Sequence, residues 1–123
     1  MTLQIRVDEG RALTNTLVLD GRLDHESVDA FDKELDAVLL SPLKFLVFDL
    51  ARLEYITSAG LRSIFRAQKA MTARGGKSAL LNPLPQVQKV LEIVKVADMS
   101  VFRSVTELDA YLDAMQKKVT GGD

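Results

Sequence analysis

The 123 residues of the chain fit a single domain, and 47% hydrophobic with 27% charged residues are globular values that exclude a disordered protein. The 16 basic and 17 acidic side chains give a net charge of -1, which argues against binding to nucleic acid or to an anionic membrane surface. The absence of cysteine excludes disulfides, thiolate zinc sites and cysteine nucleophiles. One hydrophobic core is expected at this length.

The first residues do not resemble a targeting sequence. Residues 1–8 carry charged side chains and no long apolar core, unlike a signal peptide. No run along the chain approaches the roughly 20 apolar residues of a membrane-spanning helix. We therefore expect a cytoplasmic protein without a membrane partner.

Two apolar stretches near the N-terminus predict a β-hairpin. Residues 3–7 alternate apolar and polar side chains, and a second apolar stretch spans residues 13–19. Residues 8–11 between them have the composition of a turn. The Asp-Gly-Arg sequence at residues 20–22 is expected to end the second strand.

A helix and a buried strand follow. Asp24 is suited to cap the helix, because its carboxylate can accept hydrogen bonds from free backbone N–H groups of the first turn. Ser-Pro at residues 41–42 ends the helix. Its apolar stripe consists of Val28, Phe31, Leu35, Val38 and Leu39. Residues 44–50 then contain a nearly unbroken apolar run, which predicts a central strand covered on both faces.

A second amphipathic helix is expected after a connection at residues 51–57. It starts at Thr57 and Ser58, and a glycine stop at residues 74–76 ends it. One face of the helix is formed by Leu61, Ile64, Phe65, Gln68 and Met71. From the residues alone, Ser58 is an N-cap whose hydroxyl satisfies a free backbone N–H group.

The last third of the chain continues the alternation. Residues 78–81 predict a strand, a helix follows the prolines, and residues 101–103 predict a short strand. The final helix begins at Thr106, or at Ser104 with Glu107 completing a capping box. The apolar positions of these two helices are Val87, Val90, Leu91 and Val94, and then Leu108, Tyr111, Leu112 and Met115.

The resulting order, ββαβαβαβα, predicts an α/β fold. It corresponds to one domain with a mixed β-sheet of about five strands flanked by four helices. Residues 1–119 form the domain, and residues 120–123 are expected to form a loose C-terminal tail.

The common catalytic and cofactor motifs do not fit this sequence. Residues 74–77 lack the spacing of a phosphate-binding loop and follow a helix, whose C-terminal end repels anions. Neither a dinucleotide fingerprint nor a nucleophile elbow is present. His25 is the single histidine, cannot build a usual zinc site and is expected to be a solvated residue at the helix start. We expect no enzymatic activity, no cofactor and no metal.

Two motifs resemble those of STAS domains. Residues 55–62, Tyr-Ile-Thr-Ser-Ala-Gly-Leu-Arg, resemble the phosphorylation loop of the family, because they follow the central strand and open a helix. Residues 21–25, Gly-Arg-Leu-Asp-His, resemble the family's Gly-x-Leu-Asp segment between a strand and the first helix. The order of elements is also that of the family, so the resemblance covers essentially the whole chain.

The resemblance implies an anti-sigma factor antagonist. In kinase-regulated members, the unmodified antagonist binds an anti-sigma factor that is also a serine kinase, phosphorylation of the motif serine breaks the complex, and a serine phosphatase restores it. The matching residue is Ser58. Thr57 stands where the family often has aspartate, and it is the second choice as acceptor. The implied partner-binding residues are Gly21, Arg22, Leu23, Asp24, His25, Thr57, Ser58, Ala59, Gly60, Leu61 and Arg62. We expect a monomer or a weak dimer.

Several alternatives stay open. Ala59 and Gly60 can either admit a partner's backbone or allow tight packing of the helix on the sheet, and Asp24 can be a cap rather than a contact residue. A STAS domain can also act as a constitutive adaptor in a larger signalling or transport assembly, with Ser58 only a cap. An alternative of another class is a small α/β enzyme or ligand-binding protein with a pocket at the C-terminal ends of the strands.

Overall fold

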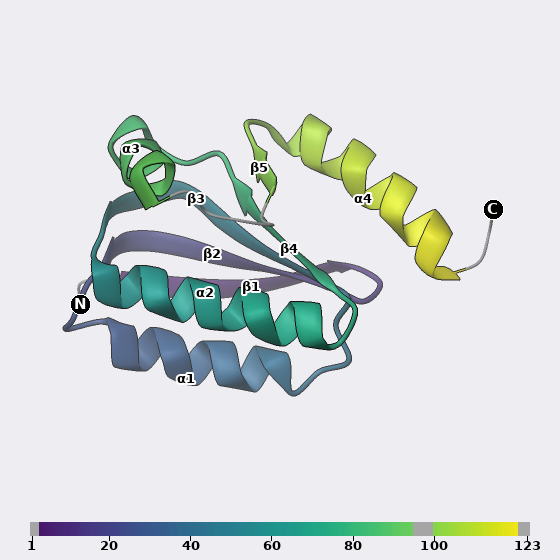
Figure 1. Cartoon of the computed structure of the whole chain (residues 1–123), viewed down its shortest axis with the longest axis horizontal. Helices are drawn as coiled ribbons and strands as arrows, with labels where there is room; N and C mark the ends of the chain where they lie inside the picture. Colours follow the sequence, from purple (N-terminus) through teal and green to yellow (C-terminus); the bar gives the residue numbers. More distant parts are fainter. Residues whose placement is uncertain (1–2, 95–99, 121–123) are drawn as a thin grey trace.

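A computed structural model of the chain describes residues 3–94 and 100–120. In chain order the elements are β1 (Leu3–Arg11), β2 (Thr14–Leu23), α1 (Val28–Leu39), β3 (Phe45–Ile56), α2 (Ser58–Ala73), β4 (Lys77–Leu81), α3 (Pro85–Val94), β5 (Ser100–Phe102) and α4 (Val105–Thr120). This is the predicted order, and the strands form one sheet (Figure 1). No helix in the described part of the chain is long and apolar enough to cross a membrane.

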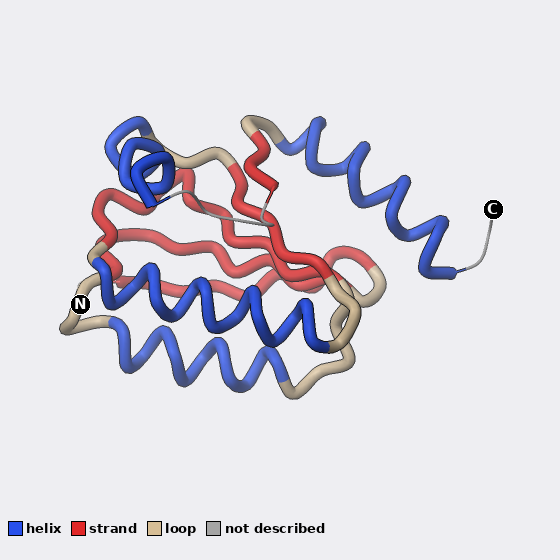
Figure 2. Tube along the Cα trace, in the orientation of Figure 1, coloured by secondary structure: helices blue, strands red, loops and turns tan. Residues whose placement is uncertain are grey.

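The sheet is mixed and has the strand order β1-β2-β3-β4-β5. β1 pairs with β2 in the antiparallel sense, and the other neighbours pair in parallel. β3 is therefore the central strand, as predicted for residues 44–50. α1 and α2 lie side by side along one face of the sheet, with their first residues at the same end (Figure 2).

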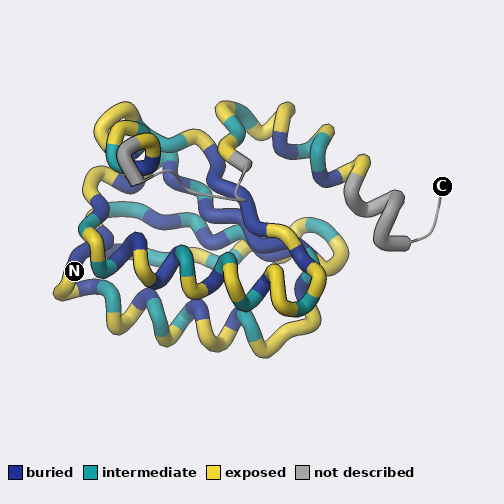
Figure 3. The backbone as a smooth tube through the Cα atoms, viewed as in Figure 1, coloured by how far each residue is buried: buried dark blue, intermediate teal, exposed yellow. Residues whose placement is uncertain are grey.

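Apolar side chains form two clusters, one on each side of the sheet, instead of the single core expected from the chain length. Leu46 and Phe48 of β3 belong to the larger cluster with α1, α2 and α3. Phe45 and Val47 belong to the smaller cluster beneath α4. Alternate residues of a strand face opposite sides, so two buried faces explain the unbroken apolar run in β3. Figure 3 shows this concentration of buried residues in the sheet.

The predicted position of the first hairpin turn is wrong. β1 continues through residues 8–11, and Arg11 pairs with Thr14 of β2. The chain reverses at residues 12–13, where Leu13 has a φ of 57°. A shift in register between Asp8 and Arg11 absorbs the polar, glycine-containing segment within the strand.

The predicted ends of the next two strands are also wrong. β2 runs through residues 20–22 to Leu23, with Gly21 at a φ of 120° beside a shift in register. β3 continues past Leu50 to Ile56, through the segment that was expected to be a connection. β2 and β3 remain paired with each other through these additional residues. The C-terminal ends of both strands therefore lie at the end of the sheet where α1 and α2 begin.

The ends of the later helices follow the sequence signals closely. The glycine stop after α2 is confirmed, because Gly75 has a φ of 75° and the N–H groups of Gly75 and Gly76 donate to carbonyls of the last turn at 3.0 and 2.7 Å. Ser104 rather than Thr106 caps α4, since the Glu107 N–H donates to the Ser104 hydroxyl at 3.2 Å.

Parts of three predictions lie outside the described residues. They are the side-chain positions of Val94 and Met115 and residues 121–123 of the expected tail. α4 itself reaches Thr120.

Candidate functional site

The two motifs singled out in the sequence meet at one end of the sheet. Leu23, the last residue of β2, is the register partner of Ile56, the last residue of β3. The Thr57 N–H donates to the Leu23 carbonyl at 3.0 Å, which ties the start of α2 to the end of β2. The turn from Asp24 to Ser27 follows directly after Leu23, and Ser58 follows directly after Thr57, so the two motifs lie next to each other. The starts of α1 and α2 lie at the same end of the sheet (Figure 1).

The turn before α1 is held by Asp24, which is buried. Its carboxylate accepts hydrogen bonds from the N–H groups of Glu26 at 3.0 Å and Ser27 at 3.1 Å. The Ser27 hydroxyl donates to the Arg22 carbonyl at 2.7 Å and accepts the Asp24 N–H at 3.0 Å. Asp24 thus performs a capping role in the turn, although α1 begins later than predicted, at Val28.

The hydrogen bonds of Asp24 favour its ionised form. Burial raises the pKa of the Asp24 carboxyl, but the donors of Ser27 and Glu26, with a smaller contribution from the charge of His25, bring the pKa below its ordinary value. The turn is therefore most stable when this carboxyl is charged.

Replacing Asp24 with asparagine is expected to lower the free energy of unfolding at neutral pH, because the amide keeps an acceptor oxygen but loses the charge. The folded pKa lies below the unfolded value of about 3.9, so the stabilising contribution is present above that value and is lost as pH falls through the folded pKa. The difference between wild type and Asp24→Asn in urea unfolding should therefore be constant at pH values above about 5 and shrink as the pH falls below about 4.

Asp29 offers a control, because it lies in the first turn of α1 and is exposed. Asp29→Asn should change stability less than Asp24→Asn at neutral pH. A difference for Asp24→Asn that stayed constant over the whole pH range would contradict a stabilising role of its charge.

The start of α2 corrects the prediction that Ser58 is an N-cap. Thr57 occupies the cap position with extended backbone, and Ser58 is the first residue of the helix. Thr57 is half-buried, and its hydroxyl lies 3.4 Å from the Leu23 carbonyl oxygen. Ser58 is exposed, and its hydroxyl has no hydrogen-bond partner among the described residues. The Ser58 hydroxyl is therefore free for chemistry at the surface.

Gly60 serves the packing of α2 on the sheet. It is buried, and a Cβ atom at this position would lie 2.6 Å from Leu23 Cγ and 3.1 Å from Ile56 Cγ1. Of the two readings of this glycine, tight packing is therefore the one the structure supports. Leu61 is also buried and faces the larger apolar cluster.

The other predicted contact residues differ in exposure. Arg22, His25, Ser58 and Arg62 are exposed, and Gly21, Thr57 and Ala59 are half-buried. The exposed position of His25 agrees with the expectation of a solvated residue. Leu23 and Asp24 are buried, so they support the exposed residues of this surface and offer little area for direct contact with a partner.

Tyr55 was missed as a surface residue of this site. The residue is 44% exposed, and the Arg22 guanidinium carbon lies 4.4 Å from the centre of the Tyr55 ring. Arg22 also lies 3.7 Å from the Asp24 carboxylate. The available signal was a large aromatic residue inside the motif at residues 55–62. Because residues 51–57 were predicted to be a connection, the direction of the Tyr55 side chain could not be inferred.

A shallow groove of about 290 Å³ between α1 and α2 extends the exposed surface next to Ser58. Arg66 crosses this groove and reaches Asp32 at 3.2 Å and Asp36 at 2.8 Å. The other residues that line the groove include Ala59 and Arg62 from the motif at residues 55–62. The spacing of the two aspartates by four residues indicated a shared helix face, but their partner on α2 required the fold.

Comparison with known proteins identifies the family. A family model described as the STAS domain matches residues 6–108. The chain belongs to the STAS domain family. This STAS domain is 28% identical over 116 residues to an anti-sigma F factor antagonist of Paenibacillus polymyxa, a match that covers 89% of the chain and 97% of the relative. An anti-sigma F factor antagonist of Lysinibacillus sphaericus is 26% identical over 80 residues, which are 64% of the chain and 68% of that relative.

Solved structures confirm the predicted STAS fold. The anti-sigma factor antagonist SpoIIAA in its unphosphorylated form has a TM-score of 0.78 and 21% identity, with 90% of this chain and 97% of that chain covered. The Bacillus cell fate determinant SpoIIAA in the phosphorylated form has a TM-score of 0.72 and 19% identity, with 89% and 99% covered. Both sequence relatives named above are anti-sigma F factor antagonists by name.

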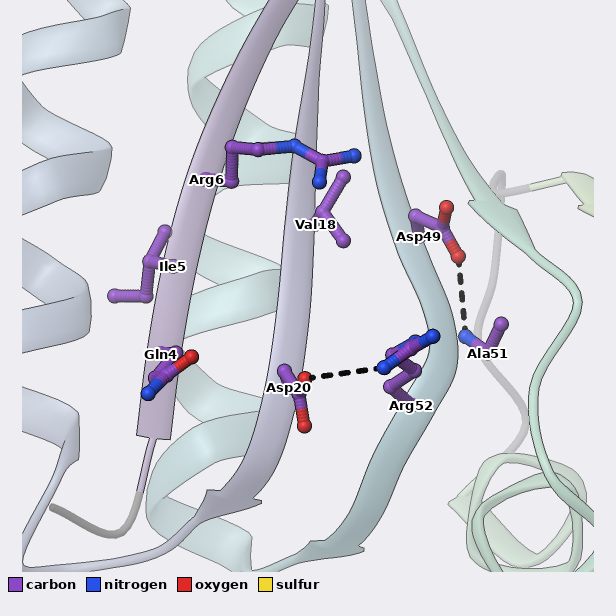
Figure 4. A pocket seen from close by; sticks show the side chains of 8 residues that line it. All are labelled: Gln4, Ile5, Arg6, Val18, Asp20, Asp49, Ala51 and Arg52. Carbon is purple, nitrogen blue, oxygen red and sulfur yellow. Dashed lines mark hydrogen bonds and ion pairs between the residues drawn. The ribbon is translucent and has the colours of Figure 1, made fainter.

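A second hollow of the STAS domain lies away from Ser58, on the sheet face opposite α1 and α2. It is a groove of about 460 Å³ across β1, β2 and β3 (Figure 4). Arg52 lies 3.7 Å from the carboxylate of Asp20, and the carboxylate of Asp49 accepts the Ala51 N–H at 3.1 Å. Each of the two carboxylates in the groove therefore already has a partner within the protein. The groove follows the strands and does not lie at their C-terminal ends, so it does not match the pocket of the ligand-binding alternative. No group of three or more acidic or histidine side chains in the described residues could hold a metal ion.

Proposed function

We propose that this STAS domain is an anti-sigma factor antagonist that acts as a phosphorylation-controlled partner switch in the cytoplasm. When unmodified, it binds an anti-sigma factor that is also a serine kinase. Phosphorylation of Ser58 by this kinase releases it, and a serine phosphatase restores the binding form. The recognition surface consists of the exposed residues around the start of α2 and the turn before α1.

The observation that carries this proposal is the exposed position of Ser58 at the first residue of α2, with a hydroxyl that makes no hydrogen bond to any described residue. A kinase can reach this oxygen without opening the fold. A phosphate would add about -1.5 to -2 charges at a helix N-terminus, where the helix dipole tolerates anions. Its effect would therefore fall on the docking surface, where new negative charge opposes a complementary partner.

The surroundings of the two hydroxyls favour Ser58 over Thr57 as acceptor. The Thr57 hydroxyl lies beside the Leu23 carbonyl in a half-buried position that also fixes the helix start. The Ser58 hydroxyl has no such role. Phosphorylation at Thr57 would have to displace a contact between β2 and α2.

Replacing Ser58 with alanine is expected to abolish phosphorylation and leave the protein permanently in its binding form. Because the hydroxyl caps nothing, the free energy of unfolding should change by less than about 0.5 kcal/mol. The protein is incubated with ATP and each anti-sigma factor kinase of the source organism, and intact-mass measurement reports phosphate incorporation. The same kinases are then tested for binding.

Thr57→Ala is the matched control, and it should still incorporate one phosphate. Incorporation into Ser58→Ala but not into Thr57→Ala would reassign the acceptor. If none of the kinases modified or bound the wild-type chain, the proposal of a phosphorylation-controlled switch would be wrong. Stable binding without any modification would instead support the constitutive adaptor.

A further inference from the structure

Arg62 lies four residues after Ser58 on α2, and both side chains are exposed. Residues at this spacing are neighbours on the surface of a helix, with Cβ atoms about 5–6 Å apart. The order is also the favourable one, since an acidic group that precedes a basic group by four residues interacts better than the reverse. A charged group on Ser58 would therefore lie within reach of the Arg62 guanidinium.

Arg62 differs from most arginines of the protein in having no ionic partner among the described residues. Carboxylate or backbone carbonyl oxygens are bound by Arg6, Arg11, Arg22, Arg52, Arg66 and Arg74. Within residues 3–94 and 100–120, Arg62 and Arg103 have neither kind of contact. In the part of the chain that the structure describes, Arg62 is thus a cation without an ionic partner, four residues after the proposed phosphorylation site.

The nearby acidic side chain does not compete for Arg62. Asp32 lines the same groove between α1 and α2, but its carboxylate is bound by Arg66 at 3.2 Å. Arg66 is itself held by Asp36 at 2.8 Å. The carboxylate of Asp32 is thus engaged by Arg66, and no ion pair joins it to Arg62 among the described residues.

We infer that Arg62 binds the phosphate of phosphorylated Ser58, forming an ion pair within α2 that exists only in the modified state. The inference rests on the proposed phosphorylation of Ser58. The pair changes the docking surface in two ways, because a phosphate appears and the positive charge of Arg62 is withdrawn from any partner. Arg62 is therefore a positioning residue of the switch.

The test uses the full chain with phosphoserine incorporated at position 58 during translation, so that neither kinase nor partner is needed. The second pKa of the phosphate, ordinarily about 6, is measured by ³¹P NMR titration in the parent, Arg62→Ala, Arg62→Lys and Lys69→Ala proteins. Lys69 is exposed further along α2, and its loss gives the same change in net charge. The other charged or titratable groups described around this surface include Arg22, Asp24, His25, Glu26, Asp32 and Arg66, and they are identical in all four proteins.

Arg62→Ala should raise the phosphate pKa by about 0.2–0.4 pH unit, since the second ionisation adds one negative charge and a helix ion pair of single charges corresponds to a shift of this size. Arg62→Lys should raise it less, and Lys69→Ala should leave it unchanged. Equal pKa values in the parent and Arg62→Ala proteins, or equal shifts in Arg62→Ala and Lys69→Ala, would overturn the inference. These outcomes are independent of whether a kinase modifies Ser58, so they are distinguishable from failure of the proposed function.

Discussion

Ser58→Asp is expected to weaken binding to the anti-sigma factor by about ten-fold or more, which corresponds to at least about 1.4 kcal/mol, while the melting temperature is preserved. The carboxylate would stand at the first residue of α2, where the helix dipole stabilises an anion by about 0.3–1 kcal/mol. At the docking surface the same charge would be desolvated or would meet acidic groups, and an unpaired charge in an interface commonly costs a few kcal/mol. Affinity and stability should therefore respond differently.

Thr106→Asp provides a matched control for this experiment. Thr106 is an exposed hydroxyl residue in the first turn of α4, on the other side of the sheet. The substitution introduces the same charge into the first turn of another helix, at its second residue. Calorimetric melting and titration against the anti-sigma factor should show unchanged affinity for Thr106→Asp. If Ser58→Asp bound as tightly as wild type, Ser58 would lie outside the interface and the constitutive adaptor would be favoured.

Gly60→Ala should destabilise the protein and disturb the site at the same time. The new Cβ atom would lie 2.6 Å from Leu23 Cγ, and Leu23 is fully buried and cannot move freely. Overpacking of this kind costs about 1–3 kcal/mol, and the better helix propensity of alanine offsets up to about 1 kcal/mol. We expect a net loss of about 1–2 kcal/mol in urea unfolding, together with weaker binding because α2 must move away from the end of β2.

Alanine substitutions at two other glycines serve as controls, because they distinguish a loss of stability from a loss of partner binding. A Cβ at Gly76 would lie 2.8 Å from the Lys44 carbonyl oxygen, at the opposite end of α2, so Gly76→Ala should lower stability but leave the affinity of the folded protein unchanged. Gly10 has open space around it, and Gly10→Ala should alter neither. If Gly60→Ala were as stable as Gly10→Ala, close packing would not be the reason for a glycine at position 60.

The predictable part of the fold is the part that depends on periodic burial. β3 was recognised from its apolar run because both faces of a central strand are covered, and α2 was recognised from its stripe and its glycine stop. These signals are local and repeat over several residues. The same signals placed Ser58 at the start of α2.

The ends of the strands could not be predicted, because irregular pairing hides them. After Leu50 the buried residues of β3 are Leu53 and Ile56, so the alternation expected of a strand is broken where the register shifts. Residues 20–22 have the composition of a turn but lie within β2. Leu13 has the positive φ of a turn residue, although leucine gives no sequence signal for a turn. The contact between Arg22 and Tyr55 depends on both extensions and was missed for this reason.

The recognition surface and α4 are supported by different apolar clusters. Among the described residues, 20 buried side chains hold α1, α2 and α3 against the sheet, whereas the cluster beneath α4 has six. The ion pairs of Arg11 with Asp109 and Asp113 add surface contacts to α4, which are individually weak. On the described side chains, we therefore expect the two sides of the sheet to form cooperative units of unequal strength, with α4 detaching at a lower free energy than global unfolding requires. Transient opening on that side would leave α2, and the hydroxyl at its first residue, in the folded form that a kinase or an anti-sigma factor would meet.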